Sequence, residues 1–188
     1  MAKIVIPATF LLYVASYLVT GWSIQLLSLI ALATVTVPLV VTDIKEHRLP
    51  NSFTSAGFIA GLGVSIILAI KENSFEPLIH TVSVALLAGS AFLVLYLFSR
   101  GGMGMGDVKL AIMLGALIAP FGWPVLVMGF IVAFILGGVC GLILLVSKKA
   151  NRKTLIPFGP YLLVGAWVSI FFGANKVQHI FNLWSINS

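Results

Sequence analysis

The sequence predicts an all-α protein: a polytopic bundle of about seven transmembrane helices. Asp, Glu, Lys and Arg make up 9% of the 188 residues and hydrophobic residues make up 60%, whereas charged residues are about 25% of a soluble domain. A soluble domain of this size leaves too much surface exposed to hide so much apolar area. The few charges are also spaced far apart, which leaves segments long enough to cross a bilayer as helices.

The charge-free segments give the order of the helices. They cover residues 4–42, 49–70, 77–99, 110–147 and 154–175. One crossing takes about 20 helical residues, so the first and fourth segments are each expected to hold two helices. Turns are predicted at 20–23 and 121–124, where Gly and Pro gather. The predicted spans are 4–20, 24–42, 53–70, 78–98, 108–122, 125–146 and 158–174. Span 108–122 is the shortest, and whether it crosses fully stays open.

The basic residues predict the orientation. With seven spans, one side of the membrane holds Lys3, Lys45, Arg48, Arg100, Lys109, Lys148, Lys149, Arg152 and Lys153, and the other holds Lys71 and Lys176. Short loops rich in Lys and Arg remain in the cytoplasm. The N-terminus is therefore expected inside, with the first span as a retained signal-anchor helix, and the C-terminus outside.

Composition also removes several classes of function. The formal net charge of +6 follows from the cytoplasmic bias of the basic loops, and no basic patch interleaved with aromatic residues suggests nucleic-acid binding. The basic loop at 148–153 is expected to contact anionic membrane lipid. Cys140 is the single cysteine, and the three histidines do not cluster, so neither a disulfide framework nor a metal site is expected. No cofactor is predicted.

Two of the five acidic residues stand at cytoplasmic ends of predicted spans. Asp43 follows the second span and Asp107 opens the fifth, after a glycine-rich stretch at 101–106. Each has an ordinary alternative: Asp43 as a solvated carboxylate beside Lys45, and Asp107 as a helix N-cap. Glu72 and Glu76 lie in the opposite loop and are expected to be solvated.

A pair of neighbouring carboxylates has a specific chemistry. Close carboxylates cannot both ionise without cost, so one keeps a proton near neutral pH. The ionised member can take a proton from water while the protonated member polarises a peptide carbonyl. The sequence alone leaves open whether Asp43 and Asp107 meet, and which would be base and which acid.

Three segments resemble those of a known family. Gly104-Met105-Gly106-Asp107 is similar to the GxGD signature of membrane aspartyl proteases in the prepilin peptidase form. The segment 43–51, which begins with Asp43 and ends with Pro50-Asn51, resembles the first catalytic motif of that family. The segment 156–161, with Pro157, Phe158, Gly159 and Pro160, resembles the proline-glycine motif before its last helix.

The resemblance implies a type IV prepilin peptidase. Such an enzyme removes short, basic class III leader peptides from pilin-like precursors at the cytoplasmic face of the inner membrane, after a glycine that precedes the hydrophobic helix of the precursor. It serves pilus assembly and protein secretion. Asp43 and Asp107 would be the catalytic pair, with Gly104 and Gly106 allowing the small movement that brings Asp107 into reach. The residues expected to support the site or bind substrate are Gly104, Gly106, Lys109, Pro50, Asn51, Pro157, Phe158, Gly159 and Pro160.

The chain also departs from the longer family members, which carry paired CxxC motifs and methylate the new N-terminus. No CxxC is present, which favours the short, peptidase-only form. Residues 1–188 are expected to form one membrane-embedded peptidase domain, with a catalytic core at about 38–172.

Two alternatives remain at this stage. A presenilin-like or signal-peptide-peptidase-like intramembrane protease shares GxGD, but there a Tyr-Asp motif lies well inside a helix, whereas Thr42 precedes Asp43 here. A small proton-coupled transporter would use acids near the middle of the bilayer, whereas all five acids here lie at span ends.

Overall fold

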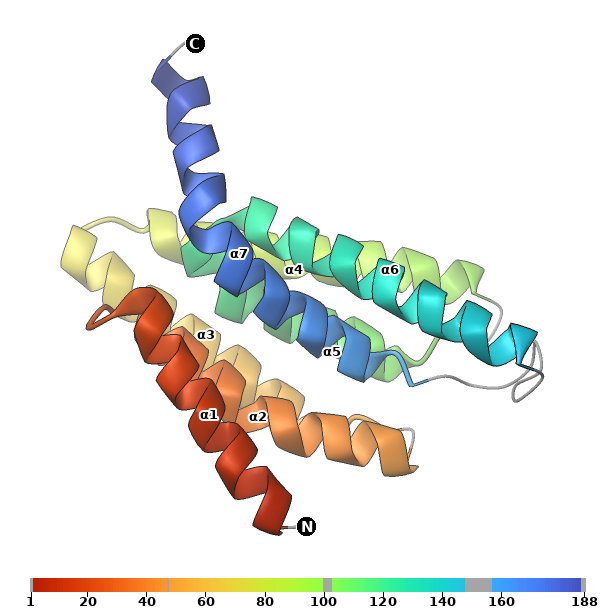
Figure 1. Cartoon of the computed structure of the whole chain (residues 1–188). Helices are drawn as coiled ribbons and strands as arrows, with labels where there is room; N and C mark the ends of the chain where they lie inside the picture. Colours follow the sequence, from red (N-terminus) through yellow and green to blue (C-terminus); the bar gives the residue numbers. More distant parts are fainter. Residues whose placement is uncertain (1, 47, 100–102, 148–156, 187–188) are drawn as a thin grey trace.

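The computed structural model describes residues 2–46, 48–99, 103–147 and 157–186, and within them the chain forms seven α-helices (Figure 1). They are α1 (Ala2–Thr20), α2 (Gln25–Glu46), α3 (Asn51–Glu72), α4 (Glu76–Phe98), α5 (Met105–Ile118), α6 (Trp123–Val146) and α7 (Gly159–Ile186), with a short 3-10 helix, η1 (Ala119–Phe121), after α5. The predicted all-α bundle is confirmed. Both predicted turns are present, and Gly21 and Gly122 take positive φ values of 58° and 93° there.

Three helices differ from the predicted spans by more than two residues at an end, and one of them is the helix predicted at 24–42, which continues to Glu46 as α2. The helix predicted at 158–174 continues to Ile186 as α7, and Figure 1 shows its C-terminal part running past the rest of the bundle. The helix predicted at 108–122 ends at Ile118 and continues only as η1. A 14-residue helix is about 21 Å long at 1.5 Å per residue, shorter than the hydrocarbon core of about 30 Å.

This short helix is the centre of the bundle. From Leu110 to Ile118 every residue of α5 except Ile112 is buried. It contacts α2, α3, α4, α6 and α7, whereas α1 packs mainly against α2 at the edge of the bundle. The other helices therefore fix the position of α5, and with it the position of Asp107 in its first turn.

Glycines allow the helices around α5 to approach closely. A Cβ at Gly115 would lie 2.7 Å from the Cα of Ala85 in α4, and one at Gly61 of α3 would lie 2.8 Å from the main-chain carbon of Ala116. Both neighbours are backbone atoms, which cannot move aside as a flexible side chain can. Small residues at helix interfaces are typical of membrane bundles, where packing replaces the hydrophobic effect as the force between helices.

The outer surface is apolar, as expected for a bundle surrounded by lipid. Ile59, Ile70, Leu86, Leu97 and Ile143 are each more than 60% exposed. Within the part of the chain that the structure describes, four helices (α2, α3, α4 and the first 22 residues of α6) are long and apolar enough to cross a membrane. The molecule is thus a membrane-type helical bundle.

A buried hydrogen bond joins α7 to α2. The indole Nε1–H of Trp167 donates to Oγ1 of Thr36 over 3.0 Å, and the same hydroxyl donates to the carbonyl of Leu32. Inside an apolar bundle such a bond has no water to compete with it. It holds the two helices together about two turns away from the ends that carry Asp43 and Gly159.

We expect Gly115→Ala to destabilise the bundle, because its methyl group meets the backbone of α4. Overpacking of this kind costs about 1–3 kcal/mol. Gly63→Ala is the matched control, since a Cβ there meets nothing within 4 Å and alanine favours a helix by about 0.5–1 kcal/mol over glycine. Thermal unfolding in detergent measures both; equal melting temperatures for the two variants would contradict the packing of α5 on α4.

Candidate active site

Three separate segments meet at one end of the bundle: the last turn of α2, the start of α5 and the start of α7 (Figure 1). The three helices contact one another in pairs. These segments are the ones that carry the three sequence motifs. Chain positions more than 100 residues apart are therefore neighbours in the fold.

Asp43 lies inside α2, three residues before the helix ends at Glu46, rather than after it as the sequence predicted. Its side chain is only 5% exposed. The main-chain N–H of Gly159, the first residue of α7, donates to its Oδ2 over 3.0 Å. Asp43 is thus a buried carboxylate tied to α7, and the solvated-loop alternative is wrong.

Asp107 occupies the third position of α5, with Gly104 as the N-cap residue. Its Oδ2 accepts a hydrogen bond from the Gly104 N–H at 3.3 Å, so it has a capping role without being the N-cap itself. The side chain is 6% exposed. Burial, together with the negative charge of nearby Asp43, raises the pKa of Asp107 from 3.8 to about 6, against the opposing effect of the Gly104 hydrogen bond. Asp43 and Asp107 are therefore close enough to interact electrostatically.

Leu49 links the three segments, although nothing in its sequence context singled it out. A Cβ at Gly106 would lie 3.1 Å from the Cβ of Leu49, and a Cβ at Gly159 would lie 3.3 Å from its Cδ2. The side chain therefore lies against both glycines, between the starts of α5 and α7. At Gly106 the requirement for glycine is close packing against this leucine.

Asn51 and Lys109 join the first motif to the second. Lys109 Nζ donates a hydrogen bond to Asn51 Oδ1 over 2.8 Å. Asn51 directly follows Pro50, which is the N-cap residue of α3. Lys109 is exposed while Asp107 is buried, and residues two apart on a helix point in different directions. Lys109 therefore faces α3 and not the two aspartates.

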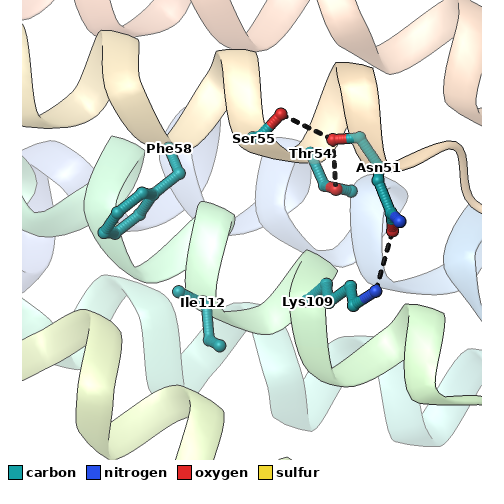
Figure 2. Close-up of a pocket in the computed structure, with 6 residues that line it drawn as sticks. All are labelled: Asn51, Thr54, Ser55, Phe58, Lys109 and Ile112. Carbon is teal, nitrogen blue, oxygen red and sulfur yellow. Dashed lines mark hydrogen bonds between the residues drawn. The ribbon is translucent and has the colours of Figure 1, made fainter.

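These two residues stand at the end of a pocket of about 260 Å³ between α3 and α5 (Figure 2). Asn51, Thr54, Ser55 and Phe58 line it from α3, and Lys109 and Ile112 from α5. The hydroxyls of Thr54 and Ser55 both donate to the carbonyl of Asn51. Phe58 and Ile112 form an apolar floor away from the polar end (Figure 2).

The residues of the third motif have different positions. Phe158 packs on α6: its ring lies 5.1 Å from that of Phe134, and a Cβ at Gly137 would meet it at 2.7 Å. Gly159 faces Asp43. Pro157 and Pro160 are half-buried beside them, and Ile156 lies outside the described residues. Phe158 thus fixes the start of α7 against α6 and places the Gly159 N–H at Asp43.

The remaining acids are exposed, namely Glu46, Glu72 and Glu76. Among the residues that the structure describes, no three His, Cys, Asp or Glu side chains cluster so as to hold a metal ion. His47 and the basic residues at 148–153 lie outside the described part.

Fold and site together define the class: a membrane-type helical bundle with two electrostatically coupled, buried aspartates at one end. A family model described as the type IV leader peptidase family matches residues 27–142. The chain belongs to this family. The matched residues include the first two motifs, with Asp43 and Asp107.

Curated relatives agree with this assignment. The chain is 32% identical over 172 residues to a prepilin leader peptidase/N-methyltransferase of Legionella pneumophila, covering 87% of this chain and 56% of the relative. It is 31% identical over 158 residues to the protein of the same name in Pseudomonas putida, covering 81% of this chain and 52% of the relative. The chain thus spans about half the length of these curated relatives. No solved structure matches it.

The raised pKa of Asp107 predicts a pH dependence of stability. The folded chain holds this proton up to about pH 6, whereas the unfolded chain releases it near 3.8. Between these values the folded state binds more protons than the unfolded state, so the free energy of unfolding falls as the pH rises. Above about pH 6 and below pH 3.8, Asp107 no longer makes the free energy of unfolding depend on pH. The difference of about two pH units corresponds to about 3 kcal/mol.

We therefore expect Asp107→Asn to gain stability relative to the wild type as the pH rises from 4 to 7. Thermal unfolding in detergent across this range measures it. Glu72→Gln, which removes an exposed carboxylate, is the control and is expected to show no such gain. A difference between Asp107→Asn and wild type that stays constant from pH 4 to pH 7 would contradict the raised pKa.

Proposed function

We propose that this protein is an aspartic endopeptidase that removes the short, basic leader peptide from type IV pilin-like precursors. The observation that carries the proposal is the buried, coupled pair of Asp43 and Asp107 in a member of the type IV leader peptidase family. The curated relatives named as prepilin leader peptidases support the same substrate class.

In the proposed reaction the pair shares one proton. The ionised carboxylate takes a proton from water as the water oxygen attacks the peptide carbonyl, and the protonated carboxyl gives its proton to the carbonyl oxygen. The tetrahedral diol then collapses: the C–N bond breaks, the leaving nitrogen takes the proton held by the first carboxylate, and the second recovers its proton from a diol hydroxyl. Water is consumed and the pair returns to its starting state.

We propose that the pocket between α3 and α5 binds the substrate beside this pair. Its apolar floor of Phe58 and Ile112 suits the hydrophobic segment that follows the cleavage site. The ammonium group of Lys109 repels a basic leader, which favours binding of the precursor with its leader directed away from the pocket. Pro50 and Asn51 fix the start of α3, and so the mouth of the pocket.

The cellular location is part of the same proposal. We propose a multi-pass protein of the inner membrane whose active site faces the cytoplasm, where the basic loops are expected. Lipid would contact the apolar outer face.

The first test replaces each aspartate by asparagine, which keeps the size of the side chain and removes its acid–base capacity. We expect Asp43→Asn and Asp107→Asn each to slow leader removal at least 100-fold, since general acid–base catalysis contributes about 10²–10⁴ in rate. The precursor is a tagged pilin with a class III leader, co-expressed and followed by its gel shift and mass.

Glu72→Gln, at the exposed end of α3, is the control and is expected to process the precursor at the wild-type rate. Normal processing by either aspartate variant would remove that aspartate from the proposed pair. Failure of the wild type to cut several such pilins, with the protein present in the membrane, would reject the function itself.

The second test separates binding from chemistry. Because Lys109 faces the pocket and not the aspartates, Lys109→Gln is expected to change KM for the precursor several-fold and to leave kcat within about twofold. Lys71→Gln, at the other end of α3, is the control. A fall in kcat at unchanged KM would instead assign Lys109 to the reacting groups.

A further inference from the structure

We infer that Gly159 is a positioning residue that decides which aspartate is the base: its main-chain N–H holds Asp43 as the carboxylate that takes the proton of water, which leaves Asp107 as the acid. The inference rests on the proposed function and deepens it. In the proposed reaction one aspartate acts as the base and the other as the acid, although the two side chains are chemically identical.

The first support is the contact itself. The Gly159 N–H donates to Oδ2 of Asp43 over 3.0 Å in a buried position. A hydrogen bond from a main-chain N–H favours the charged form of a carboxylate, and Gly159 begins a 28-residue helix whose N-terminus attracts negative charge. Asp43 lies in the last turn of α2, where the helix dipole repels an anion, so this contact opposes an unfavourable field.

The second support is the contrast with Asp107. The N–H of Gly104, in the same helix turn, donates to Asp107 Oδ2 over a longer distance, 3.3 Å. Burial and the charge of Asp43 together outweigh that bond, and the pKa of Asp107 rises to about 6. Geometry and electrostatics therefore agree that the shared proton resides on Asp107.

The third support is the identity of the residue. A Cβ at position 159 would lie 2.6 Å from Oδ2 of Asp43 and 3.2 Å from its Cγ. Gly159 does not have a positive φ, so backbone freedom does not explain the glycine. The close approach of its N–H to the carboxylate does.

Among the residues that the structure describes, the charged side chains on the elements around Asp43 other than Asp107 are exposed or face elsewhere. Asp107 faces it from α5, whereas Lys109 on the same helix faces α3. Lys45 and Glu46 on α2 and Arg48 after it are exposed, and the ionisable groups of α3, Lys71 and Glu72, lie at its far end. On α7, the hydroxyl of Tyr161 faces Cys140 of α6.

The role assignment is tested by the pH dependence of cleavage. Gly159→Ala adds a methyl group that pushes the Asp43 carboxylate off the N–H, and the side chain can move without a shift of the backbone. We expect the acidic limb of the pH–rate profile to move to higher pH by about one unit, so that kcat falls by up to about tenfold on the acidic side of the profile and is unchanged on its plateau, with KM within twofold. Gly138→Ala in α6, where a Cβ meets nothing within 4 Å, is expected to match the wild type.

A second variant removes the donor without adding bulk. Replacing Gly159 by glycolate turns its peptide N–H into an ester oxygen, and we expect the same movement of the acidic limb. A lower rate with an unmoved profile in both variants would show a merely structural role and overturn the inference.

A readout without substrate separates this inference from the proposed function. Infrared titration of the carboxyl groups in detergent, with Asp43→Asn to identify the signal of Asp43, gives the pH at which the pair takes up its second proton. We expect this pH to be about one unit higher in Gly159→Ala than in Gly138→Ala. An equal pH in the two would overturn the inference, whether or not the wild type cuts a prepilin.

Discussion

The site depends on holding two carboxylates close together in a buried position, which is unfavourable for the ionised form of each. A buried, ionised carboxylate is costly unless hydrogen bonds and helix ends stabilise it. Asp43 has the start of α7 opposite it and Asp107 has the start of α5 around it. The fold therefore brings two helix N-termini to the end of α2, and the packing of the bundle serves this arrangement.

That packing is dense where the site needs it. From Leu110 to Ile118, α5 is buried by its neighbours except at Ile112, which fixes the position of its first turn relative to α2. Thr36 and Trp167 hold α2 and α7 together two turns below the site, and Phe158 fixes the start of α7 on α6. Gly106 and Gly159 let Leu49 and the Asp43 carboxylate lie directly against backbone. A methyl group at Gly106 would meet the side chain of Leu49, and one at Gly159 would meet the Asp43 carboxylate.

The sequence predicted the helices well because charges are excluded from the bilayer and so mark where spans end. It did not predict that α5 lies at the centre. In lipid a peripheral helix is as apolar as a buried one, and α6 is almost wholly apolar although most of it faces outward. Nor did the pattern show that α7 would continue past residue 174, since the polar residues that follow can continue a helix outside the membrane.

For the site, the order of the motifs indicated the candidate residues but not the contacts between them. The electrostatic coupling of Asp43 to Asp107 and the hydrogen bond from Gly159 join residues that are 64 and 116 positions apart. Leu49 carries no chemical signature, and its role comes only from its position between two glycines. Lys109 contacts Asn51, which places its ammonium group at the pocket between α3 and α5.

The most direct test of this account is whether the segment after α2 lies against the start of α5 in the membrane. A disulfide needs Cβ atoms about 3.5–4.5 Å apart, close to the 3.1 Å between Leu49 Cβ and a Cβ at position 106. In a Cys140→Ser background, we expect Leu49→Cys with Gly106→Cys to cross-link on mild oxidation, and Leu49→Cys with Gly63→Cys to keep both thiols free. Counting free thiols by maleimide labelling in native membranes measures this. Two free thiols in the first pair would contradict the convergence on which the site depends.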